Sequence, residues 1–160
     1  MLLTLPLLAQ AATQIRVELF LAVECPISNR YIPELNRLAN TYRPKGIAFN
    51  AYFPEPGLTQ PRLDQWAKDF AIHFPVALDS NAIRARKSGA TLTPEAAIYK
   101  ASQLIYRGRI DDRYVSWGKS RPQPSRRDLA ETLDQLLAGK QPAPRFTKAW
   151  GCFIETGNRP

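Results

Sequence analysis

Apolar residues recur along the chain at spacings that alternate between those of strands and those of helices. Residues 15–23 begin as alternating apolar and polar positions and end wholly apolar, which predicts a strand entering a core. Residues 26–42 carry apolar side chains at helical spacing, and the turn residues 43–46 should end that helix. The segment 47–53 predicts a second core strand.

The alternation continues in the second half of the chain and gives way to a hairpin near its end. Alternating strands and helices build a parallel sheet, to which a hairpin adds antiparallel strands. The elements predicted there are a helix over 60–72 capped by Thr59, a strand over 73–78, a helix over 79–88, a hairpin of 96–100 with 104–110, and a last helix capped by Ser125 and ended by Gly139.

These elements predict an α/β fold: a sandwich whose central mixed sheet has a parallel core and a C-terminal antiparallel hairpin and is flanked by helices. At 160 residues the chain has room for one domain. We expect that domain to span residues 13–140, and residues 141–160 to form a C-terminal tail that docks on it.

The chain has two cysteines, Cys25 and Cys152, and one histidine, His73. These counts exclude four-ligand zinc ribbons, c-type haem attachment and His-rich metal sites, so we expect neither a metal nor a cofactor. A domain of this size buries roughly 68–70% of its unfolded surface and needs no disulfide to hold its core. The two cysteines are therefore the feature that needs an explanation.

Residues 1–12 are apolar and end in the small-residue pattern Ala9-x-Ala11, as the end of a secretory signal peptide does. The Lys or Arg residues that usually open such a signal are missing, so we interpret the segment as a truncated signal; the alternative is a frayed apolar arm. The signal predicts an exported or periplasmic protein, and the alternative a cytoplasmic one. A dozen residues are too few for a transmembrane helix, and no other segment predicts one.

The chain is basic, with 22 Lys and Arg against 14 acidic residues and a formal net charge of +8. Seven of the basic residues lie between Arg107 and Arg127, scattered over a turn-rich segment rather than along a helix or among stacking aromatic residues. This pattern does not favour nucleic-acid binding. It favours a solvated basic face that could attract an acidic protein partner.

Cys25 stands where a predicted strand meets the start of a helix, and Pro26 follows it at the first helical position. The free N–H groups and the positive end of the helix dipole stabilise a thiolate there. Ser28 can donate a hydroxyl hydrogen bond to the sulfur, whereas the carboxylate of Glu24 opposes ionisation. A reactive thiol is the interpretation we favour, and a buried structural cysteine is the alternative.

A second feature is the step Thr93-Pro94, where a proline enters a predicted strand. Together with the cysteine site it carries a resemblance to a known family. The segments that carry it are Phe20–Ser28, Tyr31, Pro33–Leu35, Thr93–Ala96 and Tyr106–Asp112.

Over residues 13–138 the chain resembles the thioredoxin-like superfamily, and within it the redoxin branch, the alkyl hydroperoxide reductase and thiol-specific antioxidant group. The resemblance implies a central sheet with flanking helices and an attacking cysteine, Cys25, at a helix N-terminus. It also implies a cis-proline, Pro94, that faces this cysteine, and a residue Thr93 whose backbone contacts a bound thiol substrate.

The chain departs from the family pattern in two ways. Ser28 occupies the place of the second cysteine of a Cys-x-x-Cys motif, so a dithiol cycle through that motif is impossible. Peroxidases of the family carry Thr or Ser where this chain has Ala22 and Pro where it has Glu18. We therefore expect a thiol–disulfide oxidoreductase that acts on a protein or small-molecule thiol or disulfide. The alternatives are a peroxiredoxin-like peroxidase and a redox-inert binding module.

Cys152 lies in an apolar island, residues 149–154, near the end of a polar tail, and that island should dock on the domain. Three relations to Cys25 are open at this point. The two residues form a permanent disulfide, for which the chain-entropy model gives roughly 4–5 kcal/mol; or Cys152 resolves a mixed disulfide on Cys25; or the two thiols never meet.

Overall fold

Strand β1 (Ile15–Phe20) lies in the middle of a six-stranded sheet, in a computed structural model that describes residues 14–155. It pairs in parallel with β2 (Ala48–Phe53) on one side and antiparallel with β5 (Glu95–Lys100) on the other. The remaining strands of this sheet are β3 (Val76–Leu78) beside β2, and β6 (Gln103–Gly108) and β9 (Arg145–Phe146) beyond β5. The predicted mixed sheet, with its parallel core and antiparallel hairpin, is confirmed.

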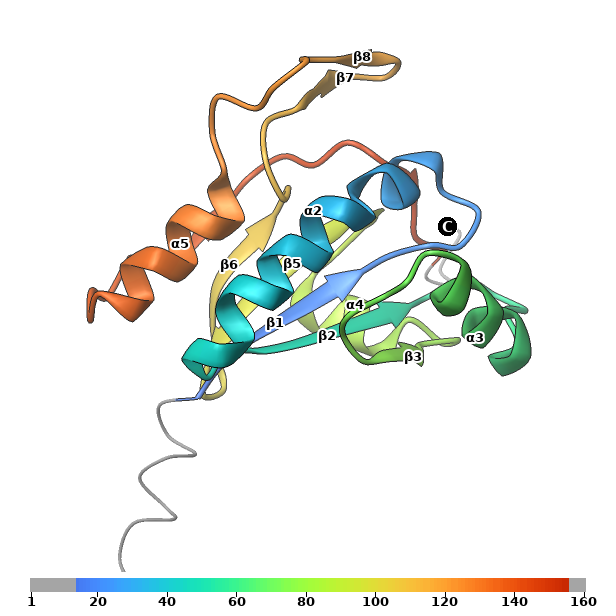
Figure 1. Ribbon diagram of the computed structural model, residues 1–160, viewed down its shortest axis with the longest axis horizontal. Coiled ribbons are helices and arrows are strands. Elements are labelled where there is room, and N and C mark those ends of the chain that lie inside the picture. Colours follow the sequence, from blue (N-terminus) through green and yellow to red (C-terminus); the bar gives the residue numbers. More distant parts are fainter. Residues whose placement is uncertain (1–13, 156–160) are drawn as a thin grey trace, which may run out of the picture.

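Helices cover both faces of this sheet (Figure 1). The helices are α2 (Pro26–Tyr42), continued by a 3-10 turn η1 (Arg43–Lys45), α3 (Gln60–Asp69), α4 (Ile83–Ser88) and α5 (Asp128–Leu137). Within the described part of the chain none of them has the length and apolar character that a membrane crossing needs.

The two faces of β1 bury different side chains, because successive residues of a strand point in opposite directions. Val17 and Leu19 belong to the larger apolar cluster, which also takes in the inner sides of α2, α3 and α5. Phe20 belongs to a smaller cluster, in which Ala85 of α4 packs on the other face. The alternation of side chains along β1 therefore separates the helices: α2, α3 and α5 pack with one set of side chains, and α4 packs with the other.

Several predicted boundaries are wrong. The strand expected over 73–78 begins only at Val76, and the helix expected over 79–88 begins only at Ile83. Two further differences have a local reason. The first strand ends at Phe20 rather than at residue 23, because the chain turns there and the Cys25 N–H donates to the carbonyl of Ala22. The helix expected to reach residue 72 ends at Asp69, and Ala71 has a φ of 46°. Thr59 precedes that helix as predicted but makes no side-chain capping bond.

Ser125 does not cap the last helix, which begins three residues later at Asp128. Its hydroxyl and its N–H both donate to the carboxylate of Asp112 instead. The Asp112 carboxylate also accepts the Arg126 N–H, so it holds the loop that leads into α5.

The C-terminal segment adds strands at two places. Strand β9 extends the main sheet by pairing with β6, and β10 (Cys152–Phe153) pairs antiparallel with the short strand β4 (Leu92–Thr93). A separate hairpin of β7 (Tyr114–Ser116) and β8 (Lys119–Ser120) projects beyond the sheet (Figure 1). The predicted signal peptide, residues 1–12, and the last residues of the tail, 156–160, lie outside the described part of the chain.

Candidate active site

Cys25 lies at the N-terminal end of α2, just beyond the central strand. It is the N-cap residue, with an extended backbone (φ −86°, ψ 112°), and Pro26 occupies the first helical position. Its carbonyl accepts the N–H of Asn29, so the first turn of the helix is formed directly after the cysteine. The residue is only 1% exposed. The geometry therefore places a buried sulfur at the positive end of a helix of 17 residues.

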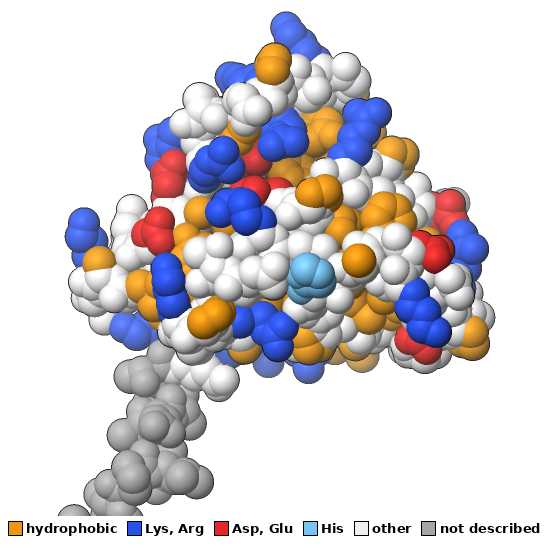
Figure 2. Space-filling view, viewed as in Figure 1, with side chains coloured by type: hydrophobic (Ala, Val, Ile, Leu, Met, Phe, Trp, Pro, Cys, Tyr) orange, Lys and Arg blue, Asp and Glu red, His pale blue; other side chains and the backbone are white. Residues whose placement is uncertain are grey.

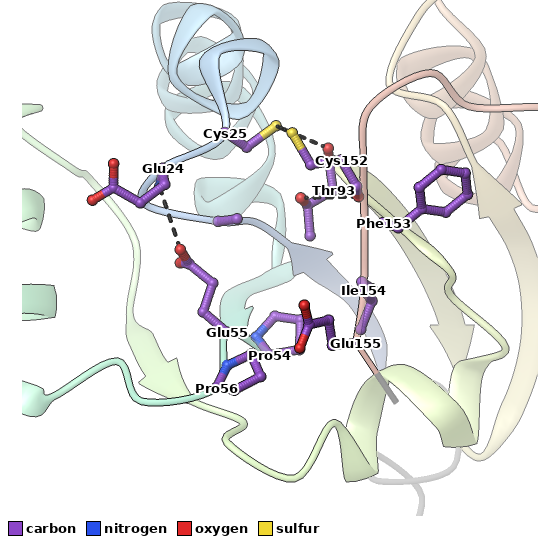
Figure 3. Close-up of a pocket in the computed structure, with 11 residues that line it drawn as sticks. Glu24, Cys25, Pro54, Glu55, Pro56, Thr93, Cys152, Phe153, Ile154 and Glu155 are labelled. Atoms are coloured by element: carbon purple, nitrogen blue, oxygen red, sulfur yellow. Dashed lines mark hydrogen bonds between the residues drawn. The ribbon is translucent and has the colours of Figure 1, made fainter. Parts of the chain in front are cut away.

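Cys152 reaches this point from the other end of the chain. In the pairing of β10 with β4 it lies opposite Thr93, and its sulfur is 2.8 Å from the sulfur of Cys25 (Figure 3). Both residues are thiols in this structure. The alternative in which the two thiols never meet is wrong, because antiparallel pairing of two segments 59 residues apart brings them together.

Hydrogen bonds make the Cys25 thiol more acidic than an ordinary cysteine. Burial raises its pKa, but this effect is outweighed by hydrogen bonds from the Cys152 thiol, from the N–H and hydroxyl of Ser28, and from the Cys152 backbone. The net pKa lies below the ordinary value of the thiol. In its protonated form Cys25 donates instead to the carbonyl of Thr93, at 3.1 Å.

The Cys152 thiol is shifted in the opposite direction. Burial raises its pKa most, and the hydrogen bond to Cys25, the negative charge on Cys25 and the carboxylate of Glu55 raise it further, to about 12. The proton shared by the pair therefore stays on Cys152 when Cys25 ionises. The two thiols therefore differ chemically: Cys25 is the one that ionises, and Cys152 donates a hydrogen bond to it.

Thr93 and Pro94 form the opposite wall of the site. The peptide bond between them is cis. The Thr93 hydroxyl donates to the carbonyl of Cys152 at 3.4 Å, and the Ile154 N–H donates to the carbonyl of Thr91 at 2.9 Å. A Cβ atom on Gly151 would collide with the Thr93 carbonyl, so the tail can approach this closely only because residue 151 is a glycine.

Ser28 is fully buried in the first turn of α2. Its oxygen accepts the N–H of Ala22 at 3.3 Å while its own hydroxyl interacts with the Cys25 sulfur. Glu18, the other position at which the chain departs from the peroxidase pattern, forms ion pairs with Arg16 and Arg84. Ala22, whose N–H bonds to Ser28, lines the site with a methyl group as its only side-chain group.

Two glutamates at the site are not among the candidate site residues expected from the sequence. Glu55 accepts the N–H groups of Val23 and Glu24 with its two carboxylate oxygens, at 2.5 and 3.3 Å, and so holds the turn before Cys25. It follows β2, whose carboxyl end adjoins that of β1 in the parallel pair, and this adjacency is the signal that could have found it.

The second glutamate, Glu95, follows Pro94 and is 5% exposed. One of its oxygens accepts the N–H groups of Thr91 and Leu92, and the other lies 3.5 Å from the Arg107 guanidinium. Burial raises its pKa above the ordinary value, although those two N–H groups and Arg107 act in the opposite direction. Its carboxyl group fixes the strand β4 on which Cys152 docks.

A pocket of about 240 Å³ opens beside the two sulfurs (Figure 3). Its lining comes from four segments: the turn that precedes α2, the loop that follows β2, Thr93 of β4, and the tail. The lining residues are Ala22, Glu24, Cys25, Pro54, Glu55, Pro56, Thr93, Cys152, Phe153, Ile154 and Glu155. The pocket gives a small molecule a way to an otherwise buried cysteine.

Acidic partners within the chain neutralise much of the basic segment. Figure 2 shows Lys and Arg side chains over the upper part of the molecule with acidic side chains among them, where Figure 1 places β7 and β8. The ion pairs of this segment are Arg107–Glu95, Arg109–Asp128, Arg121–Asp112, Arg126–Glu131 and Arg127–Glu34. Among residues 14–155 no group of three or more His, Cys, Asp or Glu side chains is arranged to hold a metal ion.

Solved structures resemble this chain over most of its length. A hypothetical protein from Sinorhizobium meliloti matches with a TM-score of 0.77 and 25% identity, over 92% of this chain and 82% of that one. An uncharacterized conserved protein from Geobacillus kaustophilus matches with a TM-score of 0.71 and 29% identity, over 92% and 80%. No family model matches the chain, and no curated protein does.

A further match is a secreted disulfide oxidoreductase of Mycobacterium tuberculosis, homologous to DsbE of Escherichia coli, with a TM-score of 0.52 and 14% identity. It covers 82% of this chain and 85% of that one. The chain has the thioredoxin-like fold. In this thioredoxin-like domain α2, whose N-cap is Cys25, follows the central strand, and the step Thr93-Pro94 faces Cys25 across the site.

Proposed function

We propose that this thioredoxin-like protein is a thiol–disulfide oxidoreductase in which Cys25 is the nucleophile and Cys152 resolves the mixed disulfide. One observation carries the proposal: two sulfurs lie 2.8 Å apart, and the pKa of one is lowered while that of the other is raised to about 12. A structural pair of thiols needs no such inequality. An exchange reaction does, because only a thiolate attacks a disulfide.

In the first step the Cys25 thiolate attacks one sulfur of a substrate disulfide. The substrate S–S bond breaks, a mixed disulfide forms on Cys25, and the departing thiolate takes up a proton. In the second step Cys152 loses its proton and attacks the Cys25 sulfur, and the second substrate thiol leaves. The substrate gains two electrons, and the protein is left with a Cys25–Cys152 disulfide that an external dithiol can reduce.

Each remaining residue of the site has a distinct part in this proposal. Ser28 stabilises the thiolate, and Pro26 fixes the first turn whose N–H groups face it. Thr93 and Pro94 form the wall against which a substrate sulfur would lie. A permanent disulfide between Cys25 and Cys152 is the alternative role for the same pair, and it predicts a bond that a reducing agent such as dithiothreitol does not open reversibly.

The test is the rate of Cys25 alkylation against pH, measured on the reduced protein. We expect a midpoint below that of free cysteine, because the hydrogen bonds from Cys152 and Ser28 lower the pKa of Cys25. A midpoint at or above that of free cysteine would sink the proposal. Mass spectrometry of the alkylated protein assigns the modified residue, since the chain contains only two cysteines.

Two further functions are tested by different measurements. A peroxiredoxin-like peroxidase would oxidise Cys25 to a sulfenic acid, and it predicts a stopped-flow reaction with hydrogen peroxide that is faster than that of a free thiol. A redox-inert binding module predicts that Cys25→Ser leaves the biological activity unchanged. No contact at the site favours either of these over thiol exchange.

We also propose that the protein works outside the cytoplasm, on a protein or small-molecule thiol or disulfide. The apolar segment 1–12 supports export, and so does the similarity to a secreted disulfide oxidoreductase. An acidic protein partner would meet the face that carries Arg113 and Lys119. A fusion of residues 1–30 to a reporter enzyme that is active only after export tests the location.

A further inference from the structure

The strand edge beside the reactive cysteine is already occupied. On this edge the Thr93 carbonyl of β4 accepts a hydrogen bond from the Cys25 thiol, at 3.1 Å. An extended peptide binds such an edge by adding a strand to it through main-chain hydrogen bonds. In this structure β10 of the same chain takes that place, with Cys152 opposite Thr93 and Phe153 opposite Leu92.

The contact between β10 and β4 is close and specific. Besides the strand pairing, the Ile154 N–H donates to Thr91 and the Thr93 hydroxyl donates to Cys152. Gly151 lies so near the Thr93 carbonyl that a larger residue would push the tail away. A peptide substrate therefore cannot bind this edge until the tail has left it.

The pocket beside the sulfurs stays open while the tail is docked, and the tail itself forms one of its walls. Cys152, Phe153, Ile154 and Glu155 line that side. The Phe153 ring points away from Cys25 (Figure 3), and the residue is 80% exposed. A volume of about 240 Å³ admits a small molecule but not a folded protein chain. Access to Cys25 is thus selective by size.

The charge of the pocket is opposite to that of the whole protein. Among residues 14–155, its lining contains three carboxylates, Glu24, Glu55 and Glu155, and neither Lys nor Arg. Arg62 forms an ion pair with Glu24 from outside the lining. The net charge of +8 comes from side chains elsewhere, and salt screens charges beyond about 8 Å at physiological ionic strength. The local carboxylates therefore decide which small ligands are attracted.

We propose that the docked tail confines the dithiol to small disulfides, with a preference for those that carry amino groups, and that an extended peptide disulfide reacts only after β10 has left β4. This inference rests on the function proposed above. The chemistry is the same exchange: Cys25 attacks, one amino thiol leaves, and Cys152 then displaces the second. Two electrons pass from the dithiol to the small disulfide, and each departing thiolate takes up one proton.

The first experiment compares three disulfides of similar size with the reduced full-length protein in single turnover. They are cystamine, which carries two positive charges, the neutral 2-hydroxyethyl disulfide, and the dianion 3,3′-dithiodipropionate. Relative to the same reactions of free 2-mercaptoethanol, we expect cystamine to react about tenfold faster than the dianion at 0.15 M salt. Equal rates, or a faster dianion, would overturn the charge preference.

Glu155→Gln should reduce the ratio of the cystamine rate to the dianion rate by about threefold, because it removes one pocket carboxylate. Asp64→Asn removes an exposed carboxylate of α3 that does not line the pocket, and it should leave the ratio unchanged. An equal effect of the two variants would mean that net charge alone sets the rate.

The second experiment uses a disulfide that joins two ten-residue peptides, with the rate of the neutral small disulfide as reference. Ile154→Pro removes the N–H that bonds to Thr91, and loss of one hydrogen bond should raise the peptide rate about three- to tenfold. Ile154→Ala keeps that N–H and is the matched control. An unchanged peptide rate in Ile154→Pro, with thermal unfolding like that of the control, would overturn the role of the tail.

The two proposals fail in different ways. If none of the disulfides reacts faster with the protein than with free 2-mercaptoethanol, the proposed function as a thiol–disulfide oxidoreductase is wrong. If all the disulfides react rapidly, without a preference for size or charge, Cys25 is an active thiol and only the selectivity proposed here is wrong.

Discussion

Replacing Cys152 with alanine removes the strongest of the hydrogen bonds that lower the pKa of Cys25. A hydrogen bond to a charged group contributes about 1.5–3 kcal/mol, and one pKa unit corresponds to about 1.36 kcal/mol. Cys25 is only 1% exposed as a residue, so little water can replace the lost donor. We therefore expect the pKa of Cys25 to rise by about one to two units in Cys152→Ala.

The assay is the absorbance of the thiolate near 240 nm against pH, checked by the rate of iodoacetamide alkylation. With Cys152 absent, every thiolate signal comes from Cys25. Cys152→Ser is the matched control: it keeps a hydroxyl donor in place of the thiol and should raise the pKa by less than Cys152→Ala. A Cys25 pKa that is unchanged or lower in Cys152→Ala would refute the assignment of Cys152 as the donor to the thiolate.

Three other substitutions test separate parts of the site and fold. Ser28→Ala should raise the pKa of Cys25 by about half to one unit, since it removes a weaker hydrogen bond, and the same absorbance titration measures it. Glu55→Gln removes a charge that raises the pKa of Cys152, so stopped-flow measurement should find resolution of the mixed disulfide about two- to threefold faster near neutral pH. Asp112→Asn should lower the free energy of unfolding by about 1–3 kcal/mol in urea titrations at pH 7. Burial raises the pKa of Asp112, but hydrogen bonds from Ser125 and Arg126 lower it to about 2, below its unfolded value. Its stabilisation is thus present above roughly pH 4 and lost as the pH falls through about 2.

The sequence predicts the sheet and most of the helices because their apolar positions repeat at a regular period. Residues 47–53 form a short run that is apolar except at Asn50, as a core strand does, and β2 buries every second side chain over Ala48–Phe53. The wrong boundaries lie where a local polar contact overrides the pattern. Ser125 has the residue type and position of a helix cap, yet the buried carboxylate of Asp112 takes both of its donors.

One half of the site is local in the sequence and the other half is not. The reactivity of Cys25 can be predicted from the segment Cys25–Ser28 itself, because a strand, a proline and the start of a helix follow one another directly there. The approach of Cys152 depends on a pairing of two residues with two residues, between segments 59 positions apart, and no periodicity predicts such a pairing. Gly151 and Glu95, which permit it, make sense only once β10 is seen on β4.

If Cys25 attacks a substrate disulfide and Cys152 resolves the mixed disulfide, both halves of the substrate are released as thiols in a single turnover. The reduced protein is mixed with an excess of a small disulfide such as cystamine, the released thiol is counted, and the protein is analysed by intact mass spectrometry. We expect two thiols to be released per protein molecule and a product two mass units lighter than the reduced chain, with Cys25 joined to Cys152. Release of a single thiol, with the other half of the disulfide still attached to the protein, would contradict these roles of the two cysteines.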